Sequence, residues 1–134
     1  MITGTRHRRL ANEARQLAVA FPRLELAADD SWLVIPDFRL PSGWTPPRTT
    51  VLVVPPLNYP EAGPDGFYLA ARLSRIVNGR LVQPGHYFGK YKNPYAAAGY
   101  HWYCLEDQAS CWDPHYDSLV TFVEAIRTYL GTPD

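Results

Sequence analysis

The chain has 134 residues, of which 46% are hydrophobic and 19% charged, so it is long enough for one globular domain with its own core. Thirteen basic and thirteen acidic side chains give a formal net charge of zero. This argues against nucleic acid as the main partner, because phosphate contacts require an excess of Lys and Arg. Two cysteines are too few for a disulfide scaffold, no apolar run is long enough to span a membrane, and no secretory signal begins the chain. We therefore expect a cytoplasmic protein with reduced thiols.

The N-terminal half predicts one helix followed by short strands. Apolar residues fall at helical spacing over 9–21, and Pro22 ends that pattern. Extended segments rich in apolar or β-branched residues follow, separated by turns that contain Asp, Gly or Pro. Pro36 suggests an edge or a bulge in the second of them. The predicted strands are 23–27, 32–38, 49–54 and 67–71.

The C-terminal half predicts a long connection and a second helix. Segment 74–99 is rich in Gly, Pro, Tyr and Asn and is mostly irregular; a connection of that length in a small domain is often functional. Segment 117–130 carries one apolar stripe, with Asp117 or Ser118 placed to cap its start. This order implies a single α+β domain over residues 1–134, with an antiparallel meander that helices cover on one face.

Two motifs with defined spacing stand out. Cys104 is followed directly by Leu105, Trp112 comes eight positions after the cysteine, and Pro114 two further on, just before the second helix. Upstream, the strand that ends at Val54 runs into a turn whose characteristic residues are Pro56, Tyr59, Pro60 and Pro64.

In these motifs and their order, the chain resembles the ubiquitin-conjugating (UBC) enzymes, in a bacterial, UBC-like branch. The resemblance covers nearly the whole chain. It implies a UBC-like fold with an N-terminal helix, a four-stranded antiparallel meander, an active-site loop and a C-terminal helix, without the last two helices of many relatives. Trp112 and the proline turn are expected to be structural.

The resemblance also implies an activity. Cys104 would accept the C-terminal glycyl group of a ubiquitin-like protein as a thioester from an activating enzyme, and pass it to an amine, most often a lysine of a protein substrate. The activating enzyme would supply the energy, so the chain itself would need no nucleotide, metal or organic cofactor. In bacterial relatives, such a pathway serves defence against phage.

The residues themselves fit this chemistry. A thiolate is an effective acyl acceptor, and a free thiol is partly ionised near neutral pH. Cys104 follows the long irregular segment, which predicts that it lies on a loop. The alternative is that Cys104 is a buried structural thiol, since free cysteine is among the most buried residue types.

One expected group is missing. The family usually has an Asn eight positions before the cysteine, which helps stabilise the oxyanion of the transfer intermediate; here that position is Ala96, and Asn93 lies three residues too early. Because an oxyanion site needs only a well-aimed hydrogen-bond donor, His101 is the first replacement candidate, and Asn93 and Tyr100 are the others.

Two acidic residues follow the thiol. Glu106 and Asp107 are candidates to orient or deprotonate the incoming amine, or else they are solvated loop charges.

Two different functions remain open. A non-catalytic UBC-like binding module would keep the fold and transfer nothing. A small zinc-stapled binding domain is the other, because four zinc-type ligands fall within fifteen residues. These are His101, Cys104, Cys111 and His115.

Overall fold

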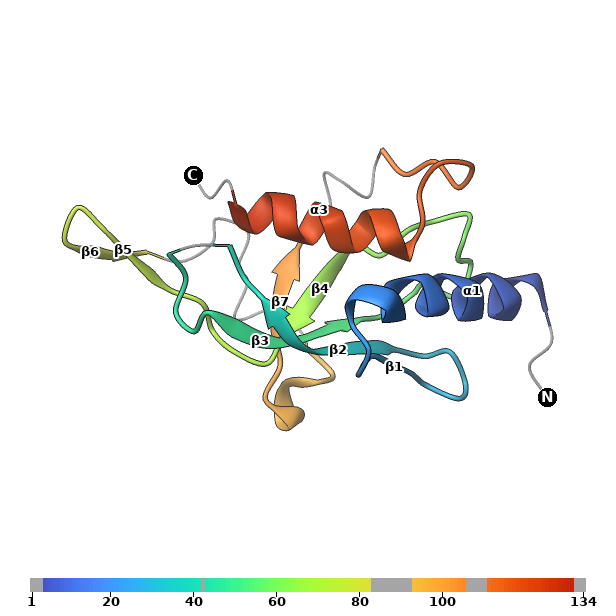
Figure 1. The fold of residues 1–134 in the computed structure, drawn as a ribbon, viewed down its shortest axis with the longest axis horizontal. Coiled ribbons are helices and arrows are strands. Elements are labelled where there is room, and N and C mark those ends of the chain that lie inside the picture. The colour runs from blue at the N-terminus through green and yellow to red at the C-terminus, as the bar shows by residue number, and fades with distance from the viewer. Residues whose placement is uncertain (1–3, 42, 83–92, 106–110, 132–134) are drawn as a thin grey trace.

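The computed structural model describes residues 4–41, 43–82, 93–105 and 111–131. Figure 1 shows the arrangement of their helices and strands. In chain order these are α1 (Thr5–Ala20), β1 (Glu25–Leu26), β2 (Leu33–Arg39), β3 (Arg48–Val53), β4 (Gly66–Leu69), β5 (Arg75–Val77), β6 (Arg80–Val82), the short 3-10 helix η1 (Ala96–Ala98), β7 (His101–Cys104) and α3 (Leu119–Gly131).

The main sheet is an antiparallel meander with one addition. Its strand order is β1-β2-β3-β4-β7, and every neighbouring pair is antiparallel. The register between β2 and β3 shifts between Ile35 and Phe38, which confirms the irregularity that Pro36 predicts. Strands β5 and β6 form a separate hairpin that projects away from the sheet (Figure 1).

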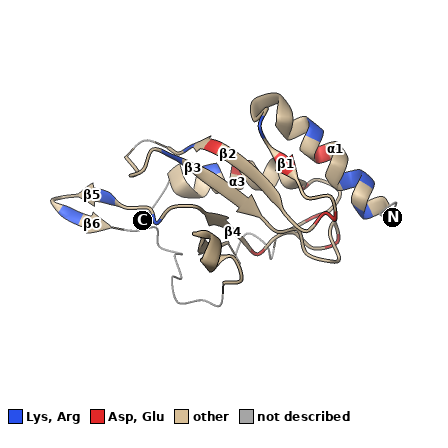
Figure 2. Cartoon of the chain, turned by 90° about the horizontal axis from the view of Figure 1, so that it is seen from below, with Lys and Arg blue, Asp and Glu red and all other residues tan. Residues whose placement is uncertain are grey.

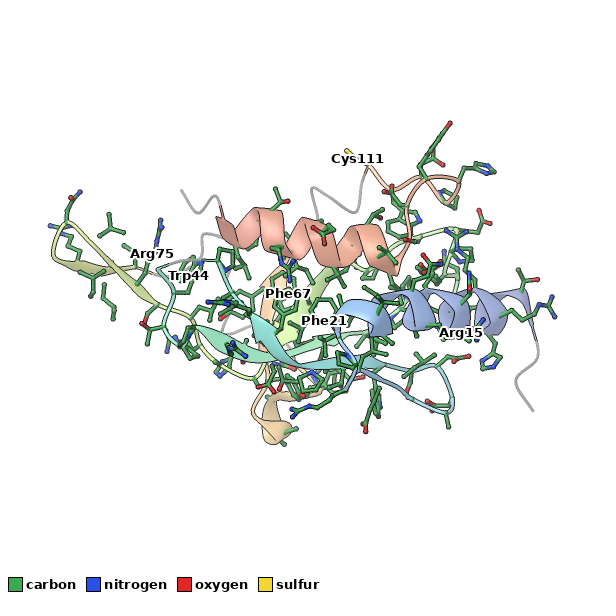
Figure 3. The ribbon with its side chains drawn as sticks, in the orientation of Figure 1. Arg15, Phe21, Trp44, Phe67, Arg75 and Cys111 are labelled. Carbon is green, nitrogen blue, oxygen red and sulfur yellow. The ribbon has the colours of Figure 1, made fainter. Side chains whose placement is uncertain are left out.

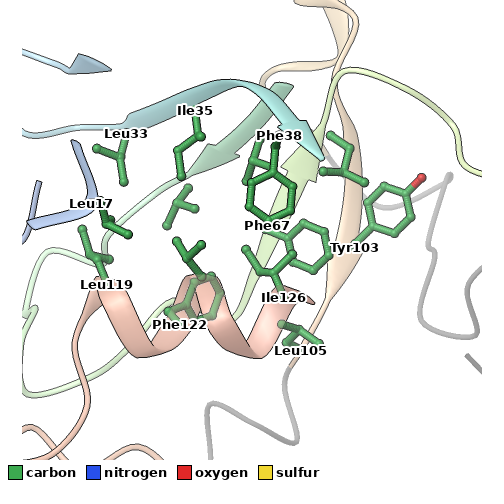
Figure 4. Close-up of a cluster of buried hydrophobic side chains, with 14 of the residues drawn as sticks. Leu17, Leu33, Ile35, Phe38, Phe67, Tyr103, Leu105, Leu119, Phe122 and Ile126 are labelled. Atoms are coloured by element: carbon green, nitrogen blue, oxygen red, sulfur yellow. The ribbon is translucent and has the colours of Figure 1, made fainter. Parts of the chain in front are cut away.

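Both helices lie on the same face of the main sheet and contact each other (Figure 1). The core fills the space between helices and sheet with apolar side chains from both (Figure 4). The side chains that the strands contribute come mostly from odd-numbered positions. The rings of Phe67 on β4 and Tyr103 on β7 stack with centroids 5.4 Å apart. Trp44 donates its indole N–H to the Leu130 carbonyl at 2.7 Å and so joins the end of α3 to the loop before β3.

The predicted α+β class, both helices and the four predicted strands are confirmed, with element ends that differ by a few residues. The main sheet has one strand more than predicted, β7, in a region interpreted as a loop. The separate β5–β6 hairpin was also not predicted, because it lies in the stretch interpreted as irregular. The hairpin had a readable signal, since Asn78-Gly79 takes left-handed backbone angles (φ of 53° and 77°) that suit a two-residue turn.

Candidate functional site

Cys104 is the last residue of β7 and is half-buried. The expectation that it lies on a loop is wrong: its backbone belongs to the sheet, paired with Gly66 of β4. Side chains alternate between the two faces of a strand, and Tyr103 points into the core, so Cys104 points to the face opposite α1 and α3. Trp102 and Tyr68 share that face, with ring centroids 4.9 Å apart.

Gly66 allows the close approach of the two strands beside the thiol. A Cβ at this position would lie 2.3 Å from the Tyr103 carbonyl oxygen and 2.6 Å from the Trp102 ring. Any side chain here would therefore push β7 away from β4 or displace the Trp102 ring. The absence of a side chain at Gly66 thus lets the backbone of Cys104 pair closely with β4.

The residue after the thiol is anchored as well. Leu105 donates its backbone N–H to the Asp65 carbonyl at 2.7 Å, and its side chain is 2% exposed. Cys104 is thus fixed from both sides, by the β4 pairing before it and by a buried leucine after it. A partly exposed thiol on a rigid backbone suits acyl transfer, which requires a reproducible approach of the reacting groups.

Trp112 docks the segment after the thiol onto the proline-rich turn. Its indole N–H donates to the Pro60 carbonyl at 2.7 Å, and its ring lies 5.8 Å from that of Tyr59. A Cβ on Gly63 would lie 2.2 Å from the Trp112 ring, so the indole rests directly on the glycine backbone. The two sequence motifs therefore meet in space.

Helix α1 completes this scaffold through Glu13, a carboxylate only 4% exposed. It accepts hydrogen bonds from the Tyr59 hydroxyl and, at 2.9 Å, from the Leu119 N–H at the start of α3. Its second oxygen pairs with Arg9 at 2.7 Å. Burial and the Glu13 carboxylate together raise the pKa of Tyr59 above its usual range.

Arg9 extends the same network to the segment before α3. Its guanidinium donates to the Pro114 carbonyl at 2.8 Å and to the Asp117 carbonyl at 2.6 Å. The helix itself is capped by Ser118, whose hydroxyl accepts the N–H of Val120 at 3.1 Å. The Ser118 alternative of the two predicted caps is thus the one found.

The structure does not bring His101 to Cys104. His101 begins β7, opposite Leu69, and Cys104 ends it, opposite Gly66. Three residues of strand separate them by about 10 Å, and an odd offset places their side chains on opposite faces. His101 therefore loses its place as the first oxyanion candidate.

Asn93 and Tyr100 serve the connection before β7. The Asn93 side chain accepts the Tyr95 N–H at 2.8 Å and donates to the Tyr100 carbonyl at 2.7 Å, so both ends of its amide are engaged. Burial raises the pKa of Tyr100. Glu106 and Asp107, the carboxylates expected to act on the incoming amine, lie outside the described residues.

The four residues of the zinc alternative are all described, and they do not form a site. In the described part of the chain, no group of three or more His, Cys, Asp or Glu side chains is placed to hold a metal ion. Cys111 is exposed and, with Trp112, lines a hollow beside α3 residues such as Thr121 (Figure 3). The structure thus gives the zinc-stapled domain no support.

The comparison with known families decides the assignment. Residues 12–132 match the model of the family described as Prokaryotic E2 family E. The chain belongs to this family. E2 denotes the ubiquitin-conjugating enzymes, so the resemblance based on the Cys104 and Tyr59 motifs is confirmed at family level. No curated protein and no solved structure matches the chain.

Membership of a prokaryotic E2 family assigns the chain to ubiquitin-like protein conjugation. Such a conjugating protein works, in general, with an activating enzyme and a ubiquitin-like protein. None of the helices among the described residues is long and apolar enough to cross a bilayer.

The sequence analysis missed two residues that support the site. Glu13 lies on the same stripe of α1 as Leu10, Ala14 and Leu17, and a carboxylate on an apolar stripe was the available signal. Gly66 gave no signal of its own, because its role depends on a strand pairing that the sequence did not reveal.

Proposed function

We propose that this member of the prokaryotic E2 family is a thioester-forming conjugating enzyme. Cys104 attacks the activated C-terminal carbonyl of a ubiquitin-like protein held on an activating enzyme and takes over the acyl group. It then passes that group to an amine, in most cases a lysine of a protein substrate. The activated carbonyl brings the chemical energy, so no nucleotide, metal or organic cofactor is assigned to this chain.

The placement of Cys104 is the observation that carries the proposal. Its thiol is half-buried on a strand that Gly66 and Leu105 hold in a fixed position, and its face of the sheet lies opposite α1 and α3. Nucleophilic catalysis needs a thiol that reaches a large protein partner without first moving backbone. The Trp112 contact and the Glu13 network keep the flanking segments in place.

The direct test is reconstitution. The purified chain is mixed with ATP and with a candidate activating enzyme and ubiquitin-like protein, and products are separated with and without a thiol reductant. We expect an adduct that the reductant removes, lost in Cys104→Ala and kept in Cys111→Ala. An adduct that persists in Cys104→Ala would reject Cys104 as the acyl carrier. The absence of an adduct with functional partners would favour a non-catalytic binding module.

We further propose that conjugation by Cys104 serves defence against phage, as the resemblance to bacterial relatives implies. Cells that carry the gene together with those of its activating enzyme and ubiquitin-like protein are compared with cells that carry Cys104→Ala in the same context. Plaque counts should rise in the variant to the level of cells without the genes. Equal protection by both versions would show that defence, if present, does not use the thiol.

A further inference from the structure

The hydrogen-bond pattern of β7 determines where the backbone N–H of Cys104 points. In an antiparallel pair, opposed residues alternate between those that exchange both backbone hydrogen bonds and those that exchange none. Leu105 donates to Asp65 at 2.7 Å, and these two residues are opposed in the register that pairs Cys104 with Gly66. Leu105 therefore faces β4, and the neighbouring Cys104 faces away from it.

The pairing of β4 with β3 independently indicates the same direction for the Cys104 N–H. Ala70 donates its N–H to the Thr50 carbonyl at 3.0 Å, so even-numbered residues of β4 bond to β3. The odd-numbered residues are left to bond to β7, where they oppose odd-numbered partners such as Tyr103. Both patterns direct the backbone N–H of Cys104 toward the outer edge of the sheet.

That edge is open at Cys104 in the part of the chain that the structure describes. There β7 has β4 as its only strand neighbour and forms one end of the sheet order (Figure 1). No acceptor for the Cys104 N–H is found among the described residues. The Cys104 N–H and the Cys104 thiol therefore lie together at the half-exposed end of β7.

The family's usual oxyanion group is absent from its usual position in this chain. Ala96 belongs to η1, and its methyl group has no hydrogen-bond donor to offer. Figure 1 shows the small light-orange coil of η1 on the opposite side of the sheet from α3, and Tyr95 beside it packs on Tyr68 with ring centroids 5.1 Å apart. The donor to the oxyanion must therefore come from another group of the chain.

We propose that the backbone N–H of Cys104 itself donates a hydrogen bond to the oxyanion of the transfer intermediate. This rests on the proposed function of Cys104. The amine nitrogen bonds to the thioester carbonyl carbon, and the π electron pair moves to oxygen, where the N–H meets it. On collapse the C–S bond breaks, the electron pair leaves with Sγ as thiolate, and the proton lost by the nitrogen is taken up through solvent. The main-chain N–H of a nucleophilic residue fills this role in serine proteases, so the proposed donor has a chemical precedent.

The test replaces one backbone N–H and nothing else. Cell-free translation with the α-hydroxy analogue of cysteine gives a full chain whose position 104 keeps its thiol and has an ester oxygen in place of N–H. After loading with the ubiquitin-like protein, single-turnover discharge to lysine or hydroxylamine is timed. We expect discharge slower by about 10²- to 10³-fold, the cost of losing one oxyanion donor.

The matched control carries the same ester at Trp102, whose N–H faces the same edge two residues away. It should discharge within about threefold of the unmodified chain, while circular dichroism confirms that both ester variants are folded. Unmodified rates in the Cys104 ester, or equal slowing in both esters, would overturn the inference. If the unmodified chain forms no thioester at all, the proposed function fails instead, so the two failures are distinct.

A second variant avoids backbone chemistry. Ala96→Asn recreates the family's usual residue, and because the Cys104 N–H already donates to the oxyanion, discharge should stay within about twofold of the unmodified chain. A tenfold acceleration would show that position 96 reaches the oxyanion and would contradict the assignment to the Cys104 N–H.

Discussion

Glu13 is the single residue on which three parts of the molecule converge. Its carboxylate joins Arg9 of its own helix, Tyr59 of the proline-rich turn and the first N–H of α3. We expect Glu13→Ala to lower the free energy of unfolding by about 3–5 kcal/mol, since it leaves buried partners without an acceptor. Urea denaturation followed by circular dichroism measures this change.

The matched control for that experiment is Glu124→Ala on the exposed face of α3, which should stay within about 0.5 kcal/mol of the parent protein. A loss below about 1 kcal/mol in Glu13→Ala would mean that the network contributes little and that packing alone joins α1 to the site.

Tyr59 provides a pH-dependent readout of the same network. Its pKa is raised in the folded state by burial and by Glu13, so the folded form holds its proton above the ordinary tyrosine value of about 10. The stability from this phenol is complete below pH 10 and is lost as the pH rises further. The stability difference between the parent and Tyr59→Phe should therefore shrink by about 1.4 kcal/mol between pH 9 and pH 11.

Tyr116→Phe serves as the reference, because Tyr116 is 82% exposed. Its difference from the parent should not change over that pH interval. A pH-independent difference for Tyr59→Phe would show that Glu13 does not hold the phenol in its protonated form.

The roles of some site residues could be predicted from the sequence, and those of others could not. Cys104, Trp112 and Tyr59 were recognised because each belongs to a motif with fixed spacing. The position of His101 could not be predicted, since its distance from Cys104 along the chain says nothing about strand parity until β7 is known. The backbone N–H of Cys104 has no sequence signal at all, because only the pairing register determines its direction.

At the level of elements, the contact between Trp112 and the proline-rich turn holds the segment that follows the thiol. Gly63→Ala should destabilise the fold by about 1–3 kcal/mol, because the new methyl group would lie 2.2 Å from the indole ring. In a Trp112→Ala background the same substitution should cost under about 0.5 kcal/mol. Equal costs in both backgrounds, measured by urea denaturation, would contradict the direct packing of these two residues.

The β5–β6 hairpin (75–82) is expected to contribute little to the stability of the domain. Ile76 and Leu81 oppose each other across it and are 67% and 69% exposed, and Figure 2 marks basic residues in blue on the same hairpin. Replacing both with Asp should change the free energy of unfolding by less than about 0.5 kcal/mol, because neither contributes to the core. A loss above about 1.5 kcal/mol would show that the hairpin packs against the domain.

Element prediction followed from the strength of the local pattern. Both helices have clear apolar stripes, and β3 is rich in β-branched residues, so these elements were found. Strand β7 was missed because its four residues, His-Trp-Tyr-Cys, follow a Gly- and Tyr-rich stretch and take their extended form from pairing with β4.

For the whole molecule, the predicted α+β class and the resemblance to conjugating enzymes agree with the observed sheet and with the prokaryotic E2 family. Both helices cover one face, and the other face carries Cys104 beside Trp102. A small domain with this division of faces presents its thiol on a surface separate from α1 and α3, which suits an enzyme that meets large protein partners.

The most direct test of the thioester proposal uses Cys104→Ser in the charging reaction. A serine oxygen at this position should form an ester with the ubiquitin-like protein, so the predicted result is an adduct that survives thiol reductants and is cleaved by dilute alkali. An adduct on Cys104→Ser that reductants still remove would place the linkage on Cys111, and would contradict the assignment of the acyl carrier to Cys104.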